Sequence, residues 1–126
     1  DLNQKPHPSS RSTADFLNVL NQYPNARSQK VWITEVGAFG KWHDAGKESL
    51  KAQNKRVKWL VGPHGFLKFH RITRVYYYHM RAIQDEPWDS GLTSAASSDA
   101  DPSPRPAWHT WCAASHGGNA HHEDCR

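Results

Sequence analysis

The alternation of two strand-like segments with three helical patterns constrains the fold of this chain most strongly. Residues 30–36 and 72–79 are rich in β-branched and aromatic residues, which predicts strands. The spacing of apolar residues predicts helices over 12–23, 47–61 and 106–111. Because a helix lies between the two strands, we expect a right-handed crossover and a parallel pair. The segment 30–36 is mostly apolar, so we expect it to be buried on both faces.

Two parallel strands do not make a complete fold by themselves, because both would keep unpaired edges. The chain has 126 residues and begins with Asp1, not Met, so we expect a processed product or a piece of a longer protein. The remaining segments, which are 1–11, 37–46 and 80–104, are predicted loops. A section of a larger α/β fold is the favoured interpretation. A small α/β interaction module, complete in itself, is the alternative.

Composition excludes several classes of function. The net charge is only +4, and we find no basic stripe with interleaved aromatics that would predict nucleic-acid binding. No apolar run is long enough to cross a membrane or to form a signal peptide, so no membrane partner is expected. Six Trp residues suit both core packing and stacking on sugar rings. The charge therefore points away from nucleic acid, and the aromatics leave a carbohydrate partner open.

The cysteines and histidines near the C-terminus do not form a pattern that we can assign. Cys112 and Cys125 are the only cysteines, so there is no disulfide framework, and the redox compartment stays open. The histidines His116, His121 and His122 lie between them, but the spacing fits no ordered zinc motif. We therefore expect no metal.

Glu35 is the leading candidate for a catalytic residue. It stands at the end of the apolar strand 30–36 and is followed at once by Gly37. Barrel enzymes keep their chemistry at this end of their strands, where a buried strand meets solvent. The plainer alternative is a carboxylate paired with a cation or a backbone amide.

Four segments resemble the clan A glycoside hydrolases when taken in order. The segment 31–37 (VWITEVG) resembles the seventh-strand motif that carries the nucleophile, and 74–79 (RVYYYH) resembles the eighth strand of cellulase-like members. Residues 88–92 (WDSGL) and 104–108 (PRPAW) resemble their closing segment. The resemblance implies that residues 1–112 are the C-terminal section of a (β/α)8 TIM barrel. That section would hold about strands 7 and 8 with flanking helices and would be incomplete on its own, and 113–126 would be a disordered tail.

The resemblance also implies an activity. The parent protein would be a retaining glycosidase acting on O-glycosidic bonds of a poly- or oligosaccharide, with Glu35 as nucleophile and no cofactor or metal. Tyr78, His79 and Trp88 would bind the substrate. The family's acid/base is a second glutamate, usually after an asparagine, and none lies upstream of Glu35. This chain alone is therefore expected to be inactive and to need the N-terminal part of the barrel. An extracellular location is implied as well.

Several positions keep two interpretations. The family often has a sugar-binding tryptophan just after the eighth strand, and here that position is Met80. The Trp88 side chain could fill space in the protein interior, or a sugar ring could stack on it. His79 could contact the ligand, or it could be a partly buried histidine with satisfied hydrogen bonds. The alternative for the whole chain is a non-catalytic carbohydrate-binding or structural remnant of the same fold.

Overall fold

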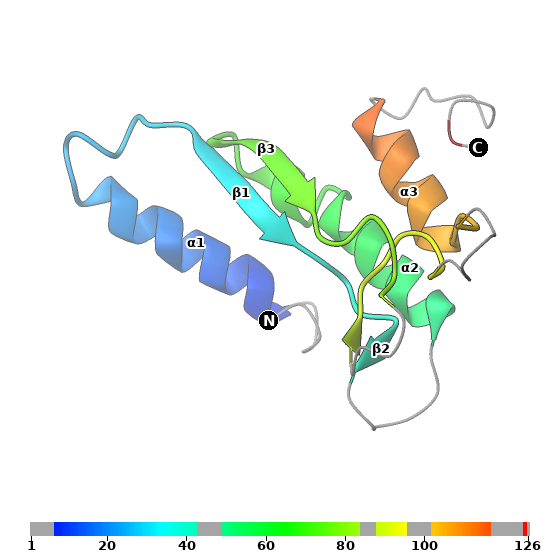
Figure 1. The fold of residues 1–126 in the computed structure, drawn as a ribbon. Coiled ribbons are helices and arrows are strands. Elements are labelled where there is room, and N and C mark those ends of the chain that lie inside the picture. The colour runs from blue at the N-terminus through cyan, green and yellow to red at the C-terminus, as the bar shows by residue number, and fades with distance from the viewer. Residues whose placement is uncertain (1–6, 43–48, 84–87, 96–101, 117–124, 126) are drawn as a thin grey trace.

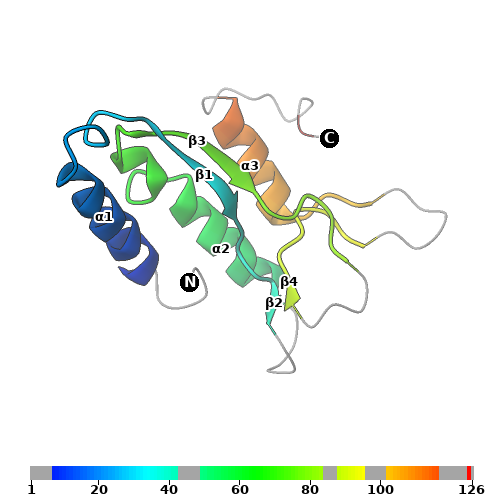
Figure 2. The same cartoon turned by 60° about the vertical axis from the view of Figure 1, so that its left-hand side comes forward.

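The computed structural model describes a mixed α/β chain built around one parallel strand pair. It describes residues 7–42, 49–83, 88–95, 102–116 and 125. The elements, in chain order, are α1 (His7–Asn21), β1 (Val31–Val36), β2 (Lys41–Trp42), α2 (Leu50–Leu60), the 3-10 helix η1 (Phe66–Lys68), β3 (Ile72–Tyr77), β4 (Trp88–Asp89) and α3 (Pro106–Ser115). Figure 1 shows β1 and β3 between α1 on one side and α3 on the other, and Figure 2 shows the same structure turned by 60°.

The two predicted strands pair with each other in parallel, as predicted. β1 and β3 form a two-stranded sheet in which Ile33 lies opposite Val75 and Val36 lies opposite Tyr77. The register shifts twice along this pair, once between Ile33 and Val36. β2 and β4 form a second, antiparallel pair inside segments that we predicted to be loops. Strands of two residues are too short to show a period of two in the sequence.

One face of the parallel pair carries the core, and the other face is bare in the described part of the chain. The core joins β1 and the segment after it to α2, the loop after β4 and α3; its buried members are Val36, Ala38, Val57, Leu60, Leu92 and Ala107. On the other face Trp32, Thr34 and Glu35 are exposed. The expectation that this strand is buried on both faces is therefore wrong for the described residues, because the packed helices α2 and α3 line only one of them.

Helix α1 begins earlier than predicted and packs little. It starts at His7, inside the predicted loop 1–11, since a proline such as Pro8 is tolerated in the first turn of a helix. It ends at Asn21, before Pro24. Leu17 is its buried apolar residue, whereas Phe16, Val19 and Tyr23 on the predicted apolar face are exposed. Most of this face has no cover among the described residues.

Helices α2 and α3 agree with the sequence in position and differ at their ends. α2 begins after Ser49, whose hydroxyl oxygen accepts a hydrogen bond from the Ala52 N–H at 3.2 Å, so it is shorter than the predicted 47–61. α3 begins at Pro106 as predicted but continues to Ser115. The predicted boundary between the barrel section 1–112 and the disordered tail 113–126 therefore falls inside this helix. Beyond it Cys125 is joined to Cys112 by a disulfide, and residues 117–124 of the predicted tail lie outside the described residues.

A groove of about 850 Å³ runs along β3, where the ends of α2 and α3 and the helix η1 meet the strand. Its walls are mainly apolar and include Leu60, Phe66, Ile72 and Trp111. β3 has β1 as its partner on one side only, so its other edge keeps unpaired N–H and C=O groups in the described structure. Among the described helices none is long and apolar enough to cross a membrane.

Candidate functional site

Glu35 lies one residue before the end of β1, on the bare side of the sheet. Its side chain is exposed, while Val36 beside it is buried in the core. No hydrogen bond or ion pair joins the Glu35 carboxylate to another described residue, so the plainer role as a paired carboxylate has no support in this part of the chain. The other described carboxylates are Asp15, in α1, and Asp89, in β4.

The strand ends of β1 and β3 approach each other closely just beyond Glu35. The Tyr78 N–H donates to the Val36 carbonyl oxygen at 2.7 Å, which extends the ladder past the end of β3. A Cβ atom at Gly37 would lie 2.3 Å from the Tyr78 carbonyl oxygen, so a larger residue could not keep this approach. The glycine after Glu35 therefore allows the two strand ends to meet. The Tyr78–His79 peptide bond in this segment is cis.

The three predicted substrate-binding residues form one aromatic cluster. The ring of His79 stacks on Trp88, with a centroid distance of 5.1 Å and an interplanar angle of 13°. The ring centroid of Tyr78 lies 3.5 Å from that of His79 and 6.1 Å from that of Trp88. Phe39, which the sequence did not single out, packs edge-on against Trp88 at 5.5 Å. Tyr78 is exposed and Trp88 half-buried, so part of the cluster faces solvent.

Ser90 fixes the backbone that carries two of these rings. Its hydroxyl donates to the Tyr78 carbonyl oxygen at 2.7 Å and accepts from the His79 N–H at 3.1 Å. Ser90 is only 1% exposed, so water does not compete for these bonds. One buried side chain thus bonds both polar groups of the peptide unit between the two aromatic residues.

A buried polar network holds the loop after β4 in place. Asp89 and Arg105 form an ion pair of 2.7 Å, and both side chains are about nine-tenths buried. The Gly91 carbonyl oxygen accepts from Arg105 Nη1 at 3.1 Å and from Gln53 Nε2 at 2.8 Å. The predicted helix 47–61 did not include Gln53 among its inward residues. Because Trp88 and Ser90 flank Asp89 in sequence, the network sets the position of both.

Tyr77 supports the segment that follows Glu35. Its hydroxyl accepts a hydrogen bond from the Ala38 N–H at 3.1 Å and donates to the Ala38 carbonyl oxygen at 3.2 Å. Burial raises the pKa of Tyr77 from 10.0 to about 12, more than its hydrogen bonds lower it. The phenol therefore stays neutral at ordinary pH, and its role is to hold this segment.

The structure brings the three predicted aromatics together, and the residues that position them were not predicted. Tyr78, His79 and Trp88 form one cluster, and the Tyr78 N–H donates to the carbonyl oxygen of Val36, which follows Glu35 in the sequence. Ser90 lies inside the 88–92 motif, which is the signal that could have marked it. No comparable signal marks Phe39.

The groove along β3 contains none of the predicted site residues. Within the described residues, the side chains with metal-ligand chemistry that lie close together are Cys112, His116 and Cys125, at the end of α3. No protein-family model, curated protein or solved structure matches this chain.

Proposed function

We propose that this chain is the C-terminal section of a (β/α)8 retaining glycosidase that cleaves O-glycosidic bonds of a poly- or oligosaccharide. The observation that carries the proposal is the aromatic cluster of Tyr78, His79 and Trp88 beside the strand end that holds Glu35. A carboxylate can act as the nucleophile of sugar cleavage, and aromatic rings can pack against the sugar. Both come from the carboxyl ends of parallel strands, or from the loops just beyond, where barrel enzymes place their sites.

In this proposal Glu35 is the nucleophile. Its carboxylate attacks the anomeric carbon and forms a glycosyl ester as the glycosidic bond breaks. A second carboxylic acid protonates the leaving oxygen and then takes a proton from the water that hydrolyses the ester. The exposure of Glu35 and its lack of a partner among the described residues support this role, since a nucleophile must be free to reach the substrate.

The aromatic cluster would hold the sugar. A sugar ring presents C–H groups on one face, and these pack against the flat face of an aromatic ring. Tyr78 and Trp88 both leave surface open to such a ring. The two hydrogen bonds between the Ser90 hydroxyl and the Tyr78–His79 peptide keep the cluster rigid. A rigid platform needs less ordering when substrate binds, which favours affinity.

The bare face of the sheet supports the idea that the chain works as part of a larger barrel. Trp32 and Tyr76 are 54% and 45% exposed there, and the apolar groove lies along β3 as well. Large apolar surfaces of this kind normally mark a contact with another part of the protein. The missing acid/base and the cover for this face would both come from the N-terminal part of the barrel.

A non-catalytic carbohydrate-binding protein is the second candidate. The described carboxylates other than Glu35 are Asp15, in α1, and Asp89, which is committed to Arg105. A retaining mechanism needs two carboxyl groups about 5–5.5 Å apart, and the described residues supply one that is free. Such a protein would bind the sugar through the aromatic cluster and would not hydrolyse it.

An extracellular location agrees with the Cys112–Cys125 disulfide, because such bonds persist mainly in oxidising compartments. The same bond would also tie the segment that ends at Cys125 to α3.

The experiment that tests the proposal compares Glu35→Gln with wild type in the full-length protein. The amide has nearly the same shape but cannot form the ester, so we expect hydrolysis of oligosaccharides to fall by roughly a thousandfold or more. The melting temperature should stay the same. Asp15→Asn is the matched control, because it neutralises an exposed carboxylate in α1.

Two results would reject this assignment. Turnover within a few-fold of wild type in Glu35→Gln would exclude Glu35 as the nucleophile. A wild-type protein that binds oligosaccharides and hydrolyses none of them would favour the carbohydrate-binding candidate.

A further inference from the structure

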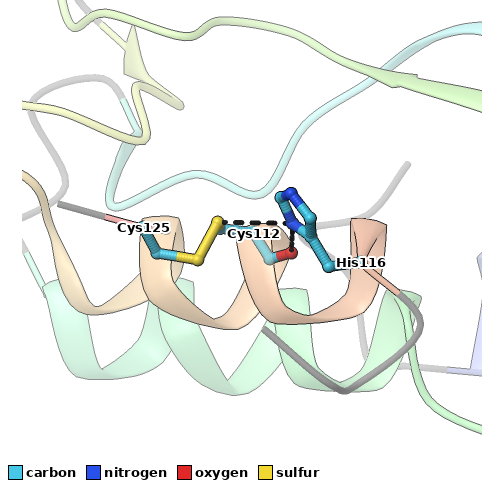
Figure 3. A group of neighbouring side chains, drawn as sticks. All are labelled: Cys112, His116 and Cys125. Carbon is cyan, nitrogen blue, oxygen red and sulfur yellow. Dashed lines mark hydrogen bonds between the residues drawn. A yellow bond between two sulfur atoms is a disulfide. The ribbon is translucent and has the colours of Figure 1, made fainter. Parts of the chain in front are cut away.

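Three side chains with metal-ligand chemistry meet at the end of α3. Cys112 and His116 are one turn apart on the helix, and Cys125 reaches the same point from outside it (Figure 3). One ligand atom from each residue lies within 4.8 Å of the other two. The two cysteines are 2% and 4% exposed, whereas His116 is exposed, so the group is buried on its sulfur side and open on its imidazole side.

The distance between the Cys112 sulfur and the His116 nitrogen is close to that in a tetrahedral zinc site. With Zn–S of about 2.3 Å and Zn–N of about 2.0–2.1 Å, tetrahedral angles place sulfur and nitrogen about 3.6 Å apart. The Cys112 sulfur and His116 Nδ1 are 3.8 Å apart. The two cysteine sulfurs are bonded to each other here, and a zinc ion between them requires that they separate to about 3.8 Å. The Cα atoms are 5.9 Å apart, which leaves the side chains room to do so.

The end of a helix is also a favourable place for a cation. The last carbonyl groups of α3 point toward its C-terminus and give this end a partial negative charge. The Cys112 carbonyl oxygen accepts from the Ser115 hydroxyl at 2.8 Å and from His116 Nδ1–H at 2.9 Å, so zinc binding at Nδ1 requires that this proton move to Nε2. Two thiolates, an imidazole and this carbonyl dipole would together attract a soft divalent cation and repel an anion.

We propose that the Cys112–Cys125 pair is a redox-exchanged site: a disulfide when oxidised, and a zinc site with His116 when reduced. Reduction breaks the S–S bond and gives two thiols: a dithiol supplies two electrons and two protons and becomes a disulfide, or a phosphine supplies two electrons, water supplies two protons, and the phosphine becomes its oxide. Zinc then displaces both thiol protons, binds the two thiolates and one imidazole nitrogen, and keeps water as its fourth ligand.

Either state would keep Cys125 tied to α3. The Trp108 indole N–H donates to the Cys125 carbonyl oxygen at 2.7 Å, so Cys125 is already held against the helix by a second contact. Loss of the disulfide therefore leaves Cys125 near Cys112, and the two thiols remain placed to share one ion. This inference is independent of the proposed glycosidase activity.

The test measures zinc binding by the full-length protein after reduction with a phosphine, using zinc alone as the probe and a chromophoric chelator as competitor. Reduced wild type should bind one more zinc ion per chain than Cys112→Ser, and His116→Ala should bind that ion at least tenfold more weakly. His64→Ala, which removes an exposed histidine before η1, should match wild type. The oxidised protein should bind no zinc at this position.

A second measurement needs no variant and is independent of any folding defect. Zinc should slow the alkylation of Cys112 and Cys125 in the reduced wild-type protein at least tenfold, as followed by peptide mass spectrometry. Equal alkylation rates with and without zinc would overturn the proposal. Equal zinc affinity of wild type and His116→Ala would overturn the role of the histidine, and with it the three-ligand site.

Discussion

The two faces of the β1–β3 pair differ sharply in how their side chains are covered. On the covered face Val36 is buried, Ile33 and Val75 pack against it, and α2 and α3 complete the core. On the bare face Arg74 lies over the ring of Trp32 at 4.5 Å, and Tyr76 stays 45% exposed. Exposed large apolar side chains that lie together often mark a contact with another part of the protein. The covered face is a packed core, and we propose that the bare face contacts the rest of a barrel.

Truncating one side chain on each face of the full-length protein tests whether the bare face is covered there. Leu60→Ala should lower the free energy of unfolding by about 2–5 kcal/mol, because Leu60 is 1% exposed and its removal leaves a cavity. Trp32→Ala should cost a comparable 3–5 kcal/mol if the rest of the barrel covers that face. Chemical denaturation measures both changes.

The control is Lys55→Ala, since Lys55 is exposed in α2 and does not line the groove along β3. An exposed substitution of this kind should change stability by no more than about 0.5 kcal/mol. If Trp32→Ala behaves like this control, the bare face has no cover in the full-length protein. The chain would then be a self-contained module and not a section of a barrel.

Alkaline pH probes the covered face through Tyr77. Burial raises the pKa of its phenol from 10.0 to about 12, so the folded state resists the deprotonation that the unfolded chain undergoes near pH 10. Stability from this group is full below pH 10 and is lost as pH rises to about 12, a loss of roughly 3 kcal/mol. Tyr77→Phe should remove this part of the pH dependence. Parallel alkaline unfolding curves for the two proteins would contradict the buried position of the hydroxyl.

A substitution at Trp88 tests the aromatic cluster, which lies beyond the carboxyl end of β3. Trp88→Ala should weaken oligosaccharide binding by about 1–3 kcal/mol if its ring packs on the substrate, as expected for the loss of a large apolar contact. Tyr23→Ala, which removes an exposed aromatic in the turn after α1, is the matched control and should leave affinity unchanged. Titration calorimetry on the full-length protein measures both. Unchanged affinity together with a lower melting temperature would show that Trp88 only fills space.

The sequence predicted the elements with strong local patterns and missed those that depend on tertiary contacts. The runs 30–36 and 72–79 carry enough β-branched residues to be recognised alone, and their order predicts the parallel pair. The two-residue strands β2 and β4 exist only through pairing with each other, so no local pattern marks them. The start of α1 at His7 was missed because polar residues and Pro8 in a first turn look like a loop.

The candidate site shows the same division. Tyr78, His79 and Trp88 were predicted because their motifs carry aromatic residues at a strand end and in a loop. Gln53 was missed because an inward polar residue departs from the apolar face of its helix, and its bond to Gly91 O becomes visible only in three dimensions. The disulfide was likewise open in the sequence, because two cysteines allow one pairing but the sequence does not show whether they are oxidised.

The most direct test of the central claim is to trap the covalent intermediate on the full-length protein. A panel of 2-deoxy-2-fluoroglycosides with good leaving groups slows hydrolysis of the glycosyl ester more than its formation, so the ester accumulates. Peptide mass spectrometry should then find one sugar per chain, on Glu35, and Glu35→Gln should remain unlabelled. A stable label on a different carboxylate, or turnover of these substrates with inversion at the anomeric carbon, would contradict the assignment of Glu35 as the nucleophile of a retaining glycosidase.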